Sequence, residues 1–329
     1  MNTIRWGLVS TARINRRVIP ALRQSPRAEL VAVASRDLAA AQAYAAEWEI
    51  PQAFGSYEAM LQSDAVDAVY ISLPNTLHAE WAIYALRHGK HVLCEKPLAT
   101  SLAEVDAMIA AANETGRMLA EAFMYRHHPQ TKLVGEWVQN GRLGDLLSVR
   151  ATFNFAMGSR NNIRLAPELG GGSLWDVGVY PVSFAQYVMG GPPVQVFGSQ
   201  WLGESGVDEL FNGQLVYSGG RLGQIASSFR TPYYTMAEVV GTNGRLSLTR
   251  PFTALDNPRR QLLFFGPDSD DPVEISVPDE YLYLGEVEDM HDAILHGQPS
   301  YLTLAETRNH VKTVLALYES ARTGQVVGV

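Results

Sequence analysis

The sequence predicts an α/β protein in which a doubly wound parallel sheet is followed by an α+β domain with an open, mainly antiparallel sheet. Up to about Phe123, short apolar runs alternate with helical stretches, which is typical of parallel βαβ units covered on both faces. Beyond about Tyr125 the pattern changes to helices and then short alternating strands, which indicates an α+β domain. Because 329 residues are enough for two domains, we expect them at residues 1–122 and 123–329.

The first domain is expected to alternate strands and helices. The strands are 4–10, 28–36, 67–75, 91–96 and 118–123, and the helices are 17–25, 37–48, 77–89 and 101–116. Asp37 is placed to cap its helix, and Ser101 with Glu104 forms a capping box. Gly89 ends the helix before it. Right-handed crossovers between such strands give a Rossmann sheet, whose ligands lie beyond the carboxyl ends of the strands.

The second domain is expected to combine helices with a run of short strands. The helices are 129–141, 174–190 and a final one, and the strands are 146–156, 194–201, 211–218, 221–230, 236–242 and 245–249. Asn243-Gly244 is a strong hairpin turn. Thr303 and Glu306 form a capping box that opens the final helix, and Gly324 closes it. The glycine-rich loop 157–173 is too long to be a simple connection.

Composition and charge limit the class of protein. Hydrophobic residues make up 47% and charged residues 18%, as in ordinary globular proteins. The net charge of -8 argues against nucleic acid or an anionic membrane as a partner. There is no long apolar run and no basic region ahead of the apolar N-terminal stretch, and the one cysteine cannot form a disulfide within the chain. We therefore expect a cytoplasmic protein of enzyme size.

The stretch HVLCEKPLAT, residues 91–100, places a charged pair at the end of a buried strand. In a doubly wound sheet this end faces the ligand crevice, so Glu95 and Lys96 are expected there. Pro97 disfavours a helical conformation for Lys96 and holds its backbone extended. The alternative is a solvated loop that carries an ion pair.

The loop after the first strand departs from the dinucleotide-binding fingerprint. Ser10, Ala12 and Asn15 stand where that fingerprint has glycines, so small size is kept at the first two positions only. A helix N-terminus still favours an anion there. The expected phosphate-side contacts are Ser10, Thr11, Ala12, Arg13 and Ile14. Taken alone, the loop is a weak signal for a nucleotide.

The end of the second strand favours NADP over NAD. An NAD site usually carries an acid here for the ribose 2′-hydroxyl, whereas this chain has Ser35 and Arg36. A guanidinium suits a 2′-phosphate, and no carboxylate repels it. The alternative is an exposed arginine at a helix cap.

Several motifs together resemble one family. GKHVLCEKPLA, LPNTLH, GGGSLWDVGVYP and VVGTNGRLSL occur in the order found in the glucose-fructose oxidoreductase, inositol dehydrogenase and rhizopine catabolism (Gfo/Idh/MocA) family of NAD(P)-dependent oxidoreductases. The resemblance spans nearly the whole chain. Within the family, RWGLVSTARIN, AFMYRHHPQ and the tyrosine at position 180 look most like aldose (xylose-type) and dihydrodiol dehydrogenases, and like 3-ketoreductases of nucleotide-linked sugars.

The resemblance implies catalytic roles for three residues. Lys96 matches the lysine of the family's Glu-Lys-Pro motif, which acts as, or assists, the general acid/base at the reacting oxygen. Tyr180 stands where many members have histidine and the dihydrodiol dehydrogenases have tyrosine, and Asp176 matches the motif's aspartate. If this segment is helical, the i,i+4 spacing puts Asp176 and Tyr180 on one face. Which of Lys96 and Tyr180 carries the proton is left open.

The resemblance also implies ligand contacts. On the cofactor side these are Leu73, Pro74, Asn75, His78, Glu95 and Lys96. On the substrate side they are Phe123, Arg126, His127, Arg164 and Trp175. His78 has an alternative as a plain helix N-terminal residue, and aromatic residues in such positions are often part of the core.

We expect no metal and no reactive thiol. Cys94 lies in an apolar strand, where free cysteine is commonly buried. The pair His127-His128 and the Glu288-x-x-His291 spacing suggest metal ligands, but a second Glu-x-x-His and additional cysteines are missing from the sequence.

The function expected first is an NADP-dependent oxidoreductase acting on a sugar or cyclic polyol. The alternatives are a trans-dihydrodiol dehydrogenase, a nucleotide-sugar 3-ketoreductase and, from another class, a non-catalytic nucleotide-sensing regulator. Family members commonly pair through the open sheet, so the resemblance also implies a homodimer or a dimer of dimers.

Overall fold

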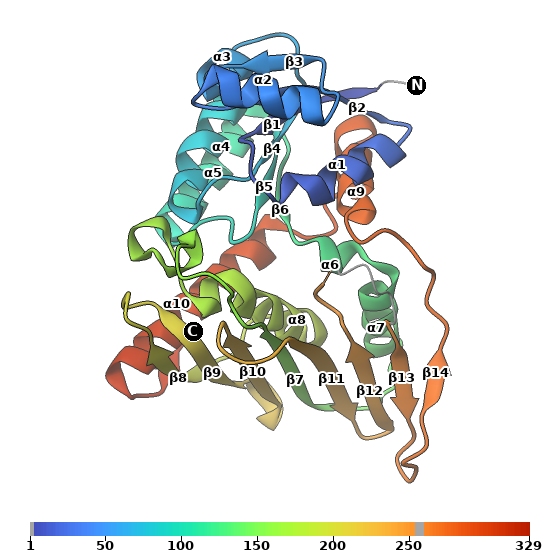
Figure 1. The fold of residues 1–329 in the computed structure, drawn as a ribbon. Coiled ribbons are helices and arrows are strands. Elements are labelled where there is room, and N and C mark those ends of the chain that lie inside the picture. Colours follow the sequence, from blue (N-terminus) through green and yellow to red (C-terminus); the bar gives the residue numbers. More distant parts are fainter. Residues whose placement is uncertain (1–2, 254–259) are drawn as a thin grey trace. The chain divides into compact units, whose positions relative to one another are not determined.

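The computed structural model describes residues 3–253 and 260–329, which form two compact units (Figure 1). The first unit is Met1–His127 with Tyr281–Thr307, and the second is His128–Glu280 with Arg308–Val329. The expected domains, 1–122 and 123–329, did not include this return of the chain to the first unit, and they stay a prediction. In the described ranges, no helix combines the length and apolar character needed to cross a membrane.

The first unit contains a six-stranded parallel sheet in the order β3-β2-β1-β4-β5-β6. Its strands are β1 (Ile4–Val9), β2 (Ala28–Ala34), β3 (Gln52–Phe54), β4 (Ala68–Ile71), β5 (His91–Glu95) and β6 (Leu119–Ala122). Its helices are α1 (Asn15–Gln24), α2 (Leu38–Glu47), α3 (Tyr57–Leu61), α4 (His78–Arg87), α5 (Leu102–Thr115), α6 (Met124–His127) and α9 (Leu284–His296). The strand order reverses between β1 and β4, and such a switch point is where doubly wound folds bind ligands. The predicted Rossmann arrangement is confirmed.

Local signals in the sequence set the ends of these helices. The Asp37 carboxylate accepts a hydrogen bond from the amide of Ala39 at 2.9 Å. Ser101 and Glu104 bond reciprocally, since the Glu104 amide donates to Ser101 Oγ and that hydroxyl donates to the Glu104 carboxylate. Each cap satisfies one backbone donor that the first helical turn leaves open. The predicted N-cap positions, Asp37 and Ser101, are confirmed.

The segment that returns to the first unit is fixed by buried polar contacts. Helix α9 packs against α1 and α6. The indole nitrogen of Trp6, which is fully buried, donates to His291 Nε2 at 3.0 Å. Arg27 bonds to the side chains of Glu288 and Asp292 on the same helix. Both residues of the Glu288-x-x-His291 spacing thus take part in contacts that hold α9 to the first unit.

The second unit contains a nine-stranded sheet in the order β14-β13-β12-β11-β7-β10-β9-β8-β15. Its strands are β7 (Leu146–Asn154), β8 (Gln195–Leu202), β9 (Asp208–Val216), β10 (Leu222–Ser228), β11 (Tyr234–Gly241), β12 (Gly244–Thr249), β13 (Leu262–Phe265), β14 (Val273–Ile275) and β15 (Val327–Gly328). Among the described strands of this nine-stranded sheet, only β7 and β10 pair in parallel. The predicted open, mainly antiparallel sheet is confirmed.

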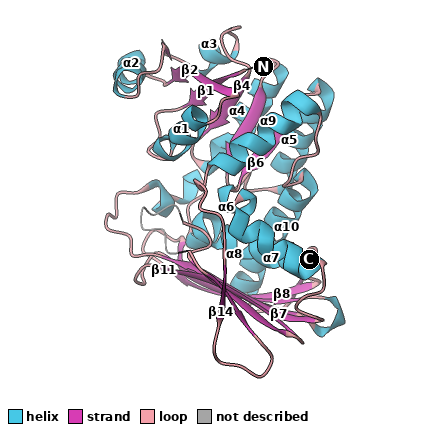
Figure 2. Cartoon of the chain, turned by 90° about the vertical axis from the view of Figure 1, so that its right-hand side faces the viewer, coloured by secondary structure: helices cyan, strands magenta, loops and turns pink. Residues whose placement is uncertain are grey.

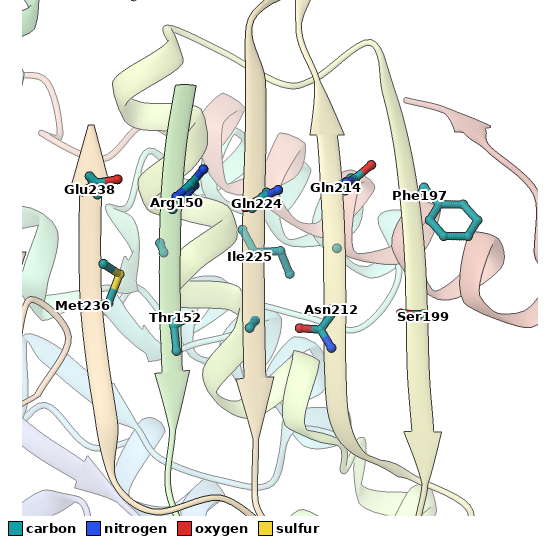
Figure 3. Close-up of a pocket in the computed structure, with 13 residues that line it drawn as sticks. Arg150, Thr152, Phe197, Ser199, Asn212, Gln214, Gln224, Ile225, Met236 and Glu238 are labelled. Atoms are coloured by element: carbon teal, nitrogen blue, oxygen red, sulfur yellow. The ribbon is translucent and has the colours of Figure 1, made fainter. Parts of the chain in front are cut away.

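Helices cover one face of this second sheet (Figure 2). They are α7 (Pro129–Gln139), α8 (Val179–Met189) and the later part of α10 (Leu304–Thr323). The strands alternate buried and exposed residues, and the buried set, which includes Phe211, Val239 and Leu246, faces the helices. The opposite face of the sheet carries the exposed side chains (Figure 3).

Candidate active site

The Glu-Lys-Pro turn at the end of β5 is held from three neighbouring elements of the first unit. The hydroxyl of Tyr70, on β4, donates to Glu95. Glu121, on β6, accepts from the Leu98 amide at 2.9 Å. His78, the first residue of α4, lies 2.8 Å from the carbonyl oxygen of Pro97. Lys96, whose peptide bond to Pro97 is cis, is therefore carried by a turn that is anchored on both sides of it.

His78 joins this turn to the segment after β4. Its side chain is fully buried, and its second ring nitrogen lies 2.8 Å from the carbonyl oxygen of Leu73. Burial lowers the pKa of His78, an effect that the two carbonyl groups partly offset. A neutral ring has one N–H, so it donates to one of these carbonyls at a time. His78 thus fixes two loops at the carboxyl edge of the sheet, and its direct contact with a cofactor stays a prediction.

A buried carboxyl group, that of Glu286, interacts with the charge of Glu95. Glu286, on α9, is 2% exposed, and neither of its oxygens has a hydrogen-bond partner in the described ranges. Burial raises the pKa of Glu286 well above its usual range, and the charges of Glu95 and Asp289 raise it further. Burial and the two neighbouring acids thus favour the protonated form of the Glu286 carboxyl group.

The expected phosphate-side residues lie between the end of β1 and the start of α1. Thr11, Arg13 and Ile14 have amides that make no hydrogen bond within the part of the chain that the structure describes. Helix α1 begins directly after them, at Asn15. Open amides at a helix N-terminus are suited to a phosphate group, so these residues fit the dinucleotide expected from the sequence.

The other cofactor candidates follow the neighbouring strands at the same edge. Ser35 and Arg36 come directly after β2, and Arg36 is exposed. Burial raises the pKa of Tyr57, and the nearby charge of Arg36 opposes that rise. Pro74 and Asn75 follow β4, next to β1 in the sheet. The cofactor candidates thus come from the carboxyl ends of four adjacent strands, β2, β1, β4 and β5.

In the second unit, the GGG motif is required by close packing. A Cβ on Gly171 would lie 2.6 Å from the carbonyl oxygen of Arg164. Gly172 has φ +125°, and a Cβ on it would lie 2.3 Å from the Asp208 carboxylate and 2.8 Å from the Tyr318 hydroxyl. Both contacts are far too short for a side chain, so only glycine allows the loop to reach the next helix in this path.

A buried carboxylate anchors the start of that helix. Asp208, on β9, is 2% exposed and accepts from Ser173 Oγ at 2.7 Å, the Leu174 amide at 2.8 Å and the Tyr318 hydroxyl at 2.7 Å. Burial raises the pKa of Asp208, and these donors oppose the rise. The helix then opens with a π-helical turn, Leu174–Gly178, before it continues as α8. Wide turns of this kind are often found at functional sites.

The side chains of Asp176 and Tyr180, which both belong to this segment, have different surroundings. Asp176 lies in the π-helical turn and pairs with Arg164 Nε at 2.5 Å. Tyr180 lies in α8, is 5% exposed, and packs against Phe153 and Phe252 with ring centroids 5.4 and 5.9 Å away. At Asp176 a π-helical turn therefore takes the place of the regular α-helix on which the i,i+4 argument depended.

Two family models match the chain. The model described as "Oxidoreductase family, NAD-binding Rossmann fold" matches residues 4–123, and the "GFO/IDH/MocA C-terminal domain" matches residues 131–247. The chain belongs to the Gfo/Idh/MocA oxidoreductase family. The resemblance found in the sequence is confirmed, and the protein is an enzyme of this oxidoreductase family.

Relatives within the Gfo/Idh/MocA family differ in their substrates. The D-xylose 1-dehydrogenase (NADP(+)) 2 of Haloferax volcanii is 40% identical over 324 residues, which cover 98% of each chain. A trans-1,2-dihydrobenzene-1,2-diol dehydrogenase of Xenopus laevis is 35% identical over 247 residues, 74% of each chain. The crystal structure of a 3-ketoreductase from Actinomadura kijaniata in complex with NADP and TDP-benzene is similar with a TM-score of 0.90 and 31% identity, and it covers 97% of this chain and 98% of that one.

The remaining substrate candidates of this Gfo/Idh/MocA protein are buried. Phe123 is fully buried, Arg126 is 1% exposed and bonds to Glu306 at 2.9 Å, and His127 lies 2.5 Å from Asp289. Trp175 is 7% exposed and packs near the Tyr318 ring. In the described ranges, no cluster of His, Cys, Asp or Glu side chains is arranged to hold a metal ion. The roles of these four residues toward a substrate stay predictions.

Sequence reasoning missed the residues that support the motifs. Tyr70 and Glu121 are polar residues in otherwise apolar strands, AVYI and LAEA, and such exceptions are a usable signal. Asp208 and Tyr318 are distant in sequence from the helix they hold, and nothing local marks them. Cys94, by contrast, is buried as expected, and burial raises the pKa of its thiol well above the usual range.

Proposed function

We propose that this Gfo/Idh/MocA enzyme is an NADP-dependent oxidoreductase of the aldose dehydrogenase type, which transfers a hydride between the nicotinamide and a sugar or cyclic polyol. The observation that carries the proposal is the anchored turn that presents Lys96 at the carboxyl edge of the parallel sheet. The full-length similarity to a D-xylose 1-dehydrogenase that uses NADP supports this substrate class.

Each part of the cofactor has candidate residues in the first unit. The open amides after β1 would hold the pyrophosphate, and Arg36 would hold the 2′-phosphate. Pro74 and Asn75, after β4, would line the nicotinamide side. The bound nicotinamide accepts or supplies the hydride, and the chain itself has to bind, orient and exchange a proton.

Proton transfer is the task that we assign to Lys96, Tyr180 and Asp176. Oxidation of an alcohol requires a proton to leave the oxygen as the hydride leaves the carbon. We propose that Lys96 and Tyr180 both act on that oxygen. The Asp176–Arg164 ion pair would orient the substrate next to Tyr180, because a carboxylate bonded to a guanidinium keeps its position.

Arg36→Asp is expected to weaken NADPH binding roughly 10- to 100-fold, because it removes a charge-assisted bond to the 2′-phosphate and adds a repelling carboxylate. The affinity for NADH should change little. Purified protein is titrated with both nucleotides while the nicotinamide fluorescence is followed. Arg87→Asp, an exposed arginine at the last turn of α4, has the same charge change and should bind NADPH normally.

Turnover by the purified wild-type protein distinguishes between the substrate classes. Turnover with D-xylose or another aldose supports the proposal, whereas turnover only with trans-dihydrodiols or with nucleotide-linked keto-sugars would favour one of the other two enzyme classes seen among the relatives. Binding of neither NADP(H) nor NAD(H) would contradict the proposal as a whole.

We further propose that two copies of the chain pair through the exposed face of the nine-stranded sheet. Figure 3 shows this face, where Gln214, Gln224 and Phe197 project from adjacent strands around a hollow of about 600 Å³. Amide side chains donate and accept, so such a face can bond to a second copy of itself. A dimer mass at micromolar concentration, which Gln224→Arg shifts toward monomer, is expected; a monomer throughout would contradict the pairing.

A further inference from the structure

The first glycine position of the dinucleotide fingerprint holds a serine in a conformation that favours glycine. Ser10 has φ 112°, in the region that L side chains rarely adopt. It directly follows β1, at the switch point of the sheet. A residue keeps such a conformation only when its surroundings hold it there. The groups that contact Ser10 must therefore stabilise a backbone conformation that glycine would adopt without such contacts.

The side chain of Asn15 makes hydrogen bonds that stabilise this conformation of Ser10. Its Nδ2 donates to the Ser10 carbonyl oxygen at 2.8 Å, and its Oδ1 accepts from Ser72 Oγ at 2.6 Å. The hydroxyls of Ser10 and Ser72 lie 2.8 Å apart. Ser10 Oγ also accepts from the Ala12 amide at 3.2 Å. The result is a closed set of hydrogen bonds that joins the loop, the start of α1 and the end of β4.

These three polar side chains are removed from water. Asn15 is fully buried, Ser72 is 7% exposed and Ser10 is 8% exposed. In a buried set of this kind, each lost partner leaves another group without a hydrogen bond. The fingerprint has a third glycine here so that the helix can pack closely on the strand. In this chain Asn15 occupies that place and is bonded to both neighbouring segments instead.

We propose that Asn15 is a positioning residue for the cofactor phosphates, because it locks Ser10 in the positive-φ conformation and thereby fixes the loop whose amides bind the pyrophosphate. This inference rests on the dinucleotide site proposed above. The hydrogen bonds of Asn15 would explain how a loop that lacks the fingerprint glycines can still bind the pyrophosphate of the dinucleotide. The amides concerned are those of Thr11, Arg13 and Ile14, next to the locked residue.

A rescue experiment separates this role from a general effect on the fold. If Asn15 acts by holding Ser10, glycine at position 10 makes the lock redundant, since glycine adopts φ 112° without strain. Asn15→Ala is therefore expected to weaken NADPH binding roughly 10- to 100-fold. In a Ser10→Gly background, the same Asn15→Ala substitution should weaken binding by less than about threefold relative to Ser10→Gly alone.

The measurement is the dissociation constant for NADPH by fluorescence titration, together with the KM values for NADP+ and for the sugar. The change should appear in the nucleotide constants and leave kcat and the sugar KM nearly unchanged. Asn140→Ala, at an exposed helix end, is the matched control and should behave as wild type. If Asn15→Ala is too unstable to purify, Ser72→Ala removes the donor to Asn15 Oδ1 and should show a smaller loss in the same constant.

The outcomes are distinct. Normal NADPH binding by Asn15→Ala would overturn the inference and leave the proposed function intact. A loss that Ser10→Gly does not rescue would show that Asn15 acts in another way, and would overturn the lock. A wild-type protein that binds neither nucleotide would overturn the proposed function and this inference with it.

Discussion

Replacing Lys96 with alanine is expected to lower kcat about 10²–10⁴-fold while NADPH still binds, since a positioned acid or base contributes that much to proton transfer. The turn around it should survive, because the hydrogen bonds that hold it come from Tyr70, His78 and Glu121 and involve no atom of the Lys96 side chain. Steady-state kinetics with the best aldose, beside an NADPH titration, measures both quantities.

Two further variants sharpen this result. Lys96→Arg keeps the charge but holds its proton, so it should remain close to Lys96→Ala in turnover if proton transfer is the role. Lys312→Ala, an exposed lysine on α10, is the matched control and should leave kcat unchanged. Unchanged turnover in Lys96→Ala, with normal nucleotide binding, would contradict the acid/base role and favour a nucleotide-sensing regulator.

Replacing Asp208 with alanine is expected to lower the free energy of unfolding by on the order of 3–5 kcal/mol. The change removes the acceptor of Ser173, Leu174 and Tyr318, and Ser173 and Leu174 are fully buried. Because these groups hold the start of the segment with Asp176 and Tyr180, turnover should fall as well. Urea unfolding followed by tryptophan fluorescence measures the change in stability.

A pair of tyrosine variants provides the control for this prediction. Tyr318→Phe removes one donor to Asp208 and should cost about 1–3 kcal/mol. Tyr217→Phe removes the same atom from a buried tyrosine whose hydroxyl has no hydrogen-bond partner in the described ranges. It should change the stability by less than about 0.5 kcal/mol. Equal losses in the two variants would show that burial, and not the bond to Asp208, sets the cost.

Much of the fold follows from patterns that are local in the sequence. Short apolar runs become the buried strands of the first sheet, and Asp37 and Ser101 cap the helices they were expected to cap. The Glu-Lys-Pro and GGG motifs could be found because their residues are contiguous. In each case the deciding interactions join residues a few positions apart, so the sequence alone contains the information.

Other features depend on residues that only folding brings together. Asn15 meets Ser72, Tyr70 meets Glu95, and Asp208 meets Tyr318, across 25 to 110 positions of the chain. Two further features were also not visible in the sequence. They are the return of Tyr281–Thr307 to the first unit and the π-helical turn before α8. The sequence by itself determined the two sheets, the family and the motifs that carry the chemistry. Tertiary structure decided which buried polar groups hold those motifs, because a hydrogen-bond partner far along the chain leaves no periodic or local signal.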